Sequence, residues 1–274
     1  MPNDFSGDNN CVALWRMEED ALTVDSCTWN SARNTLTGKG TPENDTADFK
    51  EGACSADLDP AGGGQDSFYL PDADLCAEFP LKTGDTNKKI SACGWFRFDS
   101  LSNYEGPFGK GDYGYGDNSV RPLYIESSGR WYSDIGYYDG SIQTEVLYQS
   151  DVSNLAQTGR WYHFGFTFDG IAKSWKLVVW DDTDSTKVIN VQGECTNDIY
   201  VGGASVRVGA IGSFAEIDPL GEIDGNIDEI VVFNDILTLP QIDGIRAGIY
   251  PEVLGGSTFW PILFSLIEQQ RKGE

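Results

Sequence analysis

The chain has 274 residues, 40% of them hydrophobic and 12% aromatic, and carries a formal net charge of −24 at pH 7. These values indicate a folded protein with a sizeable core, and one β-sandwich of about 240 residues accounts for most of the length. The charge argues against nucleic acid and anionic membranes as partners, because both require Lys and Arg to neutralise phosphate groups. The first ten residues are polar and no apolar run is long enough to cross a membrane, so we expect neither a signal peptide nor a transmembrane segment.

The first half of the chain predicts short strands separated by long loops. We expect a flexible lead over residues 1–10, a first strand from Cys11 to Arg16, and mostly loops between Asp25 and Pro60. From Lys89 to Asp99 apolar and polar residues alternate, which is typical of a strand. Residues 104–119 predict a long loop rich in glycine and tyrosine.

The following residues predict an antiparallel sheet. RPLYIES, GRWYSDIGYY and SIQTEVLYQ form a meander with turns at Ser127–Gly129 and Asp139–Gly140. The segments WYHFGFTFDG and KSWKLVVWDD form the clearest hairpin, joined at Asp169–Gly170. No helix longer than two turns is expected before residue 238.

The stretch from Gly221 to Leu239, GEIDGNIDEIVVFNDILTL, predicts a central strand and then a short helix. Both faces of this strand carry bulky side chains, so we expect it to be covered on both sides. Strict alternation puts one set on one face, Ile227, Glu229, Val231 and Phe233, and the other set on the opposite face, Asp228, Ile230 and Val232.

The last residues, 251–274, predict a linker and an amphipathic helical tail. Phe259, Leu263, Leu266 and Ile267 recur at helical spacing, and Trp260 adds a fifth large side chain. Such a helix must dock, either on its own sandwich or on a partner chain, and these two alternatives stay open.

Several of these segments together resemble the laminin-G-like, concanavalin-A-like jelly rolls. The closing strand matches the family pattern at Gly225, Ile227, Asp228, Glu229, Phe233, Asn234, Leu237 and Thr238, and VALWRMEEDALTVDS resembles the family's opening strand and Asp-Ser loop. The resemblance covers about residues 11–250. It implies an all-β fold, a two-sheet antiparallel β-sandwich with a short C-terminal helix, preceded by the lead 1–10 and followed by the tail 251–274.

The resemblance also implies calcium. In this family the Asp-Ser loop after the first strand meets the acid of the closing strand around the ion, and the matching positions are Asp25 and Asp228, with Asn30 as a third ligand. The loop departs from the family pattern, since it is written DSCTWNSARN and lacks both glycines. The alternative is that Asp25 caps a turn and Asp228 is an ordinary strand acid.

We predict no enzymatic activity. EIDGNIDE resembles the signature of laminarinase-type glucanases, but Asn226 and Ile227 stand where the acid/base Glu is needed after Glu222. His163, the only histidine, lies in a strand pattern and is interpreted as structural. The six cysteines lack metal-site spacing, which argues against zinc and leaves their pairing open.

Glycan binding is the preferred ligand hypothesis. Tyr113, Tyr115, Asp117 and Asn118 combine aromatic faces with hydrogen-bonding groups in a loop that cannot bury them all. Tyr104, Trp131, Tyr137 and Tyr138 occur nearby in the sequence, and each taken singly is more typical of a core residue.

The function predicted from all these features is a non-enzymatic binding or structural module. We expect a protein of a phage virion surface, decorating the particle or associated with a fibre, that adheres to glycans. It contacts other virion or surface proteins, or a second copy of itself, through the tail residues Phe259, Trp260, Leu263, Leu266 and Ile267. A secreted or cell-surface carbohydrate-binding module is the alternative, and a glycoside hydrolase comes third.

Overall fold

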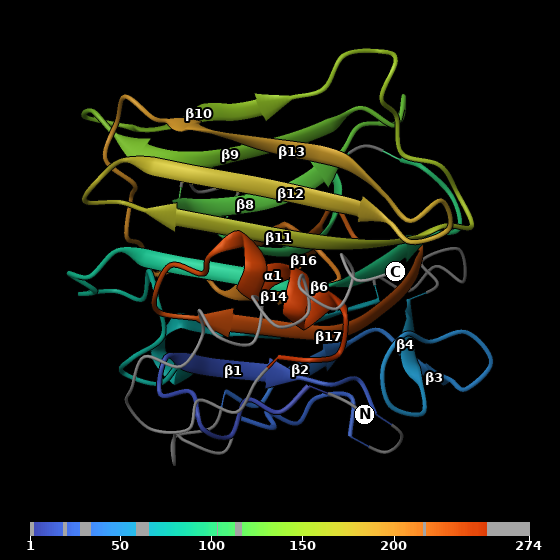
Figure 1. Cartoon of the computed structure of the whole chain (residues 1–274). Helices are drawn as coiled ribbons and strands as arrows, with labels where there is room; N and C mark the ends of the chain where they lie inside the picture. The colour runs from blue at the N-terminus through green and yellow to red at the C-terminus, as the bar shows by residue number, and fades with distance from the viewer. Residues whose placement is uncertain are drawn as a thin grey trace, which may run out of the picture.

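The computed structural model describes residues 3–18, 21–27, 34–58, 66–102, 104–112, 117–215 and 218–250. In these ranges two antiparallel sheets face each other and one α-helix lies outside them (Figure 1). The predicted all-β sandwich is therefore confirmed. No helix within the described ranges is long and apolar enough to cross a membrane.

The first sheet, called sheet A here, contains the closing strand. Its strands run in the order β13 (Thr186–Glu194), β12 (Ser174–Asp181), β11 (Trp161–Asp169), β6 (Lys89–Phe98), β17 (Gly225–Phe233), β4 (Ser55–Leu58) and β3 (Glu43–Asp45). β1 (Cys11–Trp15) also pairs with β17, with Cys11 opposite Phe233 and Trp15 opposite Ile230. The expected proximity of the first and closing strands is thus confirmed.

The second sheet, sheet B, contains the predicted meander. Its order is β10 (Ile142–Gln149), β9 (Trp131–Tyr138), β8 (Asp117–Ile125), β7 (Glu105–Asp112), β14 (Val206–Val208), β5 (Ser67–Leu70) and β2 (Thr37–Lys39). A separate hairpin, β15 (Gly212–Ala215) with β16 (Asp218–Leu220), follows β14, and a 3-10 turn, η2 (Asp72–Asp74), follows β5.

The main core fills the space between the two sheets and is rich in aromatic rings. Phe96 of β6 contacts Trp131 of β9 at a centroid distance of 6.2 Å and stacks on Tyr162 of β11 at 5.7 Å. All three side chains are buried. Each such side chain is worth about 1.5–3 kcal/mol through burial. Trp131 is therefore a core residue and not part of an exposed aromatic group.

The helix α1 (Leu239–Arg246) covers part of the outer face of sheet A (Figure 1). It begins with a capping box, in which Thr238 and Gln241 each satisfy a backbone N–H of the other. Its Ile242 packs over Gly165 of β11, where a Cβ would lie only 2.3 Å from the Ile242 side chain. The absence of a side chain at this position lets the helix approach the sheet, and a second apolar cluster forms beneath it around Val231 and Phe233.

Candidate functional site

The most unusual feature of the described structure is a β-bulge in the closing strand. Asp228 lies opposite Trp95 and Val231 lies opposite Cys93, so β17 holds one more residue than β6 over this interval. The extra residue adopts a left-handed conformation at Glu229, with φ of 44°, which is uncommon for a residue other than glycine.

The bulge corrects the face assignment made by strict alternation. Ile227 and Ile230 both belong to the core between the sheets, while Val231 belongs to the outer cluster under α1. Asp228 and Glu229 fall between these two inward residues and both lie outside the inter-sheet core. The prediction that they occupy opposite faces was wrong, because one inserted residue shifts the period of two.

Asp228 is fully buried at the bulge. Its Oδ2 accepts hydrogen bonds from the backbone N–H groups of Lys50 at 2.8 Å and Glu51 at 2.9 Å. Its Oδ1 is buried and has no hydrogen-bond partner among the described residues. Burial raises the pKa of Asp228 to about 8, against the two N–H groups that lower it, and the neighbouring Glu229 and Glu18 carboxylates raise it further.

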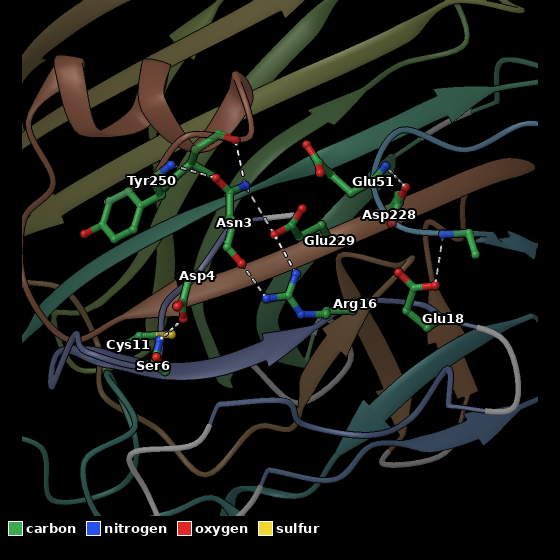
Figure 2. A network of polar contacts seen from close by, with 12 residues as sticks. Asn3, Asp4, Ser6, Cys11, Arg16, Glu18, Glu51, Asp228, Glu229 and Tyr250 are labelled. Atoms are coloured by element: carbon green, nitrogen blue, oxygen red, sulfur yellow. Dashed lines mark hydrogen bonds and ion pairs between the residues drawn. The ribbon is translucent and has the colours of Figure 1, made fainter. Parts of the chain in front are cut away.

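Glu229 is only 1% exposed. Its Oε1 accepts from Asn3 Nδ2 at 3.2 Å and from Arg16 Nη1 at 3.3 Å (Figure 2). Its Oε2 is buried and has no partner in the part of the chain that the structure describes. Burial and the carboxylate of Glu51 raise the pKa of Glu229 to about 8, and Arg16 opposes the shift. Two neighbouring carboxyl groups are therefore buried at the bulge, and among the described residues Arg16 is the cationic side chain that pairs with one of them, Glu229.

The N-terminal lead closes this site. Asn3 donates from Nδ2 to the carbonyl oxygen of Ile245 at 2.8 Å, and its Oδ1 accepts from the N–H of Tyr250 at 2.9 Å. Its carbonyl oxygen accepts from Arg16 Nη2 at 2.6 Å (Figure 2). Residues 3–10, expected as a flexible lead, thus lie against β17 and the end of α1, with Phe5 in ring contact with Phe233 at 5.9 Å.

Chemically, the bulge can hold either protons or a cation. A buried carboxylate with an unpartnered oxygen is costly unless it is neutralised. Calcium prefers six to eight oxygen ligands. Within the part of the chain that the structure describes, no group of three or more His, Cys, Asp or Glu side chains is placed to hold a metal ion. Calcium therefore remains a prediction.

Asp25, the other expected calcium ligand, braces its own loop. Its Oδ1 accepts from the N–H groups of Leu14 at 3.0 Å and Cys27 at 2.9 Å, and its Oδ2 accepts from the N–H of Asn34 at 2.9 Å. This is the turn-capping role that the sequence left open as an alternative. Asn30 lies outside the described residues.

The expected glycan-binding loop, residues 104–119, is mostly strand: Glu105–Asp112 form β7 and residues 117–119 begin β8, so the prediction of a loop was wrong for them. Tyr113 and Tyr115 lie outside the described residues, and Asp117 and Asn118 are described as backbone of β8, where Asp117 pairs with Asp112. Because β8 and β9 are antiparallel, the start of β8 lies at the same end of sheet B as Tyr138.

At that end two tyrosines form an edge that we call the tyrosine edge, Tyr138 and Tyr200. Tyr138 is 63% exposed, and its ring lies 6.2 Å from that of Tyr200 at an interplanar angle of 30°. The N–H of Tyr200 donates to the carbonyl oxygen of Gly136 at 2.8 Å, which attaches its loop to β9. Sequence reasoning missed Tyr200, because nothing in the pattern around it signals this pairing.

His163 lies buried on the outer face of sheet A. Its ring contacts Trp95 edge-on at 4.9 Å, and neither ring nitrogen has a hydrogen-bond partner within the described ranges. Burial lowers the pKa of His163 to about 3, so the imidazole is neutral. This is the environment of a packed structural histidine and agrees with the interpretation from the sequence.

Glu222 and Asn226, the remaining positions of the glucanase-like stretch, differ in environment. Glu222 is half-buried, and burial raises its pKa. The amide of Asn226 bonds other side chains: its Oδ1 accepts from Arg97 at 2.9 Å and its Nδ2 donates to Ser55 Oγ at 3.1 Å.

The tail residues predicted to contact a partner lie outside the described residues: Phe259, Trp260, Leu263, Leu266 and Ile267.

No protein-family profile and no curated protein matches the sequence of this chain. Its fold is similar to that of botulinum neurotoxin type C, whose cell entry depends upon interaction with two ganglioside molecules, with a TM-score of 0.56, 13% identity, and 89% of this chain and 52% of that chain covered. The binding domain of botulinum neurotoxin DC, solved in complex with rat synaptotagmin II, gives a TM-score of 0.57 at 11% identity, with coverage of 89% and 52%.

A third similar structure is the enzymatically active domain of tailspike protein 2 from bacteriophage CBA120. Its TM-score is 0.52 at 15% identity, with 80% of this chain and 30% of that chain covered. This chain thus spans about half the length of the neurotoxin chains and less than a third of the tailspike chain. At such identities the likeness establishes the fold alone.

Proposed function

We propose that this chain is a non-catalytic module that binds carbohydrate through the tyrosine edge, and that it does so as a surface protein of a phage particle. The observation that carries the proposal is the ring pair of the exposed Tyr138 and the half-buried Tyr200. Sugar rings present apolar C–H faces that stack on aromatic rings, and we take for such a contact the value of about 0.5–1.5 kcal/mol that a pair of aromatic rings contributes beyond the buried area. A ring that is 63% exposed on a rigid strand is available for such stacking.

Hydrogen-bonding groups lie next to these rings in the sequence. Asp139 directly follows Tyr138, and Asp198 precedes Tyr200 by two residues and pairs with Lys173 at 3.0 Å. Specific carbohydrate sites combine such polar groups with an aromatic platform. Cell entry of botulinum neurotoxin type C, which is similar in fold, depends upon interaction with two ganglioside molecules, and this likeness supports the proposal of a glycan site on the sandwich.

The proposal that the chain is non-catalytic rests on Asn226, which follows Glu222 in the glucanase-like stretch. A retaining glycosidase needs two carboxyl groups about 5 Å apart across the scissile bond. In the glucanase-like stretch the position of the second acid is taken by Asn226, whose amide bonds Arg97 and Ser55. A secreted or cell-surface lectin-like module would use the same tyrosine edge, and only the location of the protein separates it from a virion protein.

Calcium is kept as a proposal at the bulge. The Oδ1 of Asp228 and the Oε2 of Glu229, which have no partner among the residues that the structure describes, are the buried oxygens that a cation would satisfy. When bound, the ion would neutralise the pair and join β17 to the loop that carries Glu51. Asp25 holds its loop in either case.

The test is a glycan array probed with the full chain and with two variants, Tyr138→Ala and Tyr200→Ala. Each variant is expected to weaken binding about 2- to 10-fold, as the loss of one ring contact implies. Tyr104→Ala is the matched control, because Tyr104 is a partly exposed tyrosine at the opposite end of sheet B. Equal binding by all variants, or no glycan bound at all, would contradict the tyrosine edge. Antibody labelling of intact particles in negative stain tests the virion location.

A further inference from the structure

A groove on the outer face of sheet A takes no part in the function proposed above. Its floor consists of side chains from three adjacent strands, and its volume is about 390 Å³, within the range of small-molecule sites. The register explains why these side chains share a face: Thr167 lies opposite Lys176, which lies opposite Gln192, and Ser174 lies opposite Glu194.

One wall of the groove is apolar and held in place. It consists of Ile236 and Leu237, in the connection between β17 and α1. The hydroxyl of the buried Ser91 donates to the carbonyl oxygen of Asp235 at 2.7 Å and accepts from the N–H of Leu237 at 2.9 Å. The wall is therefore fixed to β6 on both sides of Ile236 and does not depend on the groove being filled.

Of the polar side chains of the floor, Ser174, Gln192 and Glu194 are exposed, Lys176 is half-buried and Thr167 is buried. Among the described residues, none of the five floor side chains makes a hydrogen bond or an ion pair with the rest of the chain: Thr167, Ser174, Lys176, Gln192 and Glu194. Their neighbours on the same face are engaged, since Lys187 pairs with Asp243 at 3.5 Å and Arg97 pairs with Asp48 at 3.1 Å. Thr167 is only 5% exposed, so its hydroxyl has little access to water outside the groove.

The types of side chain define the ligand. Lys176 only donates and Glu194 only accepts, while the two hydroxyls and the amide of Gln192 do both. Their charges are opposite, so the groove offers no net attraction to an ion. The hydroxyl groups of a sugar donate and accept at once, and its C–H face suits the wall of Ile236 and Leu237. The geometry points to a second carbohydrate site here, separate from the tyrosine edge, that takes a short neutral saccharide.

The inference shares its ligand class with the proposed function, and the experiment keeps the two apart. The ¹⁵N-labelled chain is titrated with maltose, cellobiose and lactose, and with sialyllactose as an anionic comparison, while backbone amide signals are followed. At least one neutral disaccharide is expected to shift the signals of Lys176 and Gln192. In K176A and Q192A the affinity at these signals should fall about 2- to 10-fold, which corresponds to one lost hydrogen bond.

One control variant completes the design. Asn190→Ala alters an exposed amide on β13 outside the groove and should leave the affinity read from the groove signals unchanged. The inference fails if no disaccharide shifts the groove signals, if K176A and Q192A bind as the parent does, or if sialyllactose binds more tightly than lactose. If a disaccharide shifts the groove signals but Tyr138→Ala leaves binding on the glycan array unchanged, the tyrosine edge alone is refuted. If Tyr138→Ala weakens array binding but no disaccharide shifts the groove signals, the groove alone is refuted.

Discussion

Replacing the two bulge acids by their amides should flatten the pH dependence of stability. Burial raises the pKa values of Asp228 and Glu229 to about 8, from ordinary values near 4. The folded chain therefore keeps protons that the unfolded chain has already released. The stabilising contribution of each carboxyl is complete below about pH 4 and is lost as the pH rises through about 8.

The size of the effect follows from the interval between the two pKa values. Each rise of one pH unit within this interval lowers the free energy of unfolding by about 1.4 kcal/mol per carboxyl group. Between pH 5 and pH 7 a single such group would thus lower the free energy of unfolding by up to about 3 kcal/mol. For a chain of this size that corresponds to a fall in Tm of roughly 5–10 °C. Asp228→Asn and Glu229→Gln remove this dependence and keep the acceptor oxygens that face Lys50, Glu51, Asn3 and Arg16.

The assay is thermal unfolding in EDTA at each half unit from pH 5 to pH 8. The difference in Tm between each amide variant and the parent should grow steadily in favour of the variant as the pH rises. Asp139→Asn, which alters an exposed aspartate on the turn after β9, is the control and should follow the parent. Parallel curves for the parent and the bulge variants, or amide variants that lose stability relative to the parent above pH 7, would refute the reasoning.

Three further predictions concern calcium, the helix cap and the tail. Calcium should raise the Tm of the parent above its value in EDTA and leave that of Asp228→Asn unchanged; an equal shift in both would place the ion elsewhere. Thr238→Ala removes the capping box of α1 and should destabilise the chain by about 1 kcal/mol in denaturant unfolding, whereas Thr238→Ser should not. Deletion of residues 255–274 should leave the sandwich folded by circular dichroism but reduce assembly with itself or a partner in sedimentation; unchanged assembly would show that the tail is only a local cover.

The fold was accessible from the sequence because its evidence is local. Alternation in the segment from Lys89 to Asp99 and in WYHFGFTFDG reports one buried face directly, and the turns at Asp139–Gly140 and Asp169–Gly170 join strands that pair with each other. The pairing of the first strand with the closing strand is not local. The resemblance of both strands to one family implied it, and the register of Cys11 with Phe233 confirms it.

The bulge could not be found in the same way. Strict alternation assigns a face to every residue of β17, and a single insertion at Glu229 changes the face of every residue on one side of it. The burial of the two acids depends on Asn3 and on the loop at Lys50, which lie 226 and 178 residues away from Glu229 and Asp228. No window of the sequence contains these partners, so an ordinary strand acid was the natural alternative.

The tyrosine edge and the groove pose a related problem. Tyr138 is one of many tyrosines in a β-rich chain, and its exposure and its pairing with Tyr200 are set by the strand arrangement rather than by any pattern around it. In the groove, Thr167, Lys176 and Gln192 are separated in sequence and are brought together by strand register. What identifies the groove is the lack of partners for its side chains among the described residues, and such a feature can be recognised only when all neighbours are known.

Two weak carbohydrate sites on different sheets would behave differently on a particle and in solution. Each proposed site offers one or two ring contacts or a few hydrogen bonds, so its affinity as a single site is modest. When copies of one chain are arrayed on a surface, the second contact becomes intramolecular and the overall avidity can exceed the single-site affinity by 10²- to 10⁴-fold. A variant whose single-site affinity falls by a small factor would then lose that factor in affinity at every engaged copy. Titration of the isolated chain measures the affinity of an individual site, whereas adhesion of particles measures the combined affinity of all engaged sites. A phage-surface role therefore requires that Tyr138→Ala weaken adhesion by a larger factor than it weakens binding by the isolated chain.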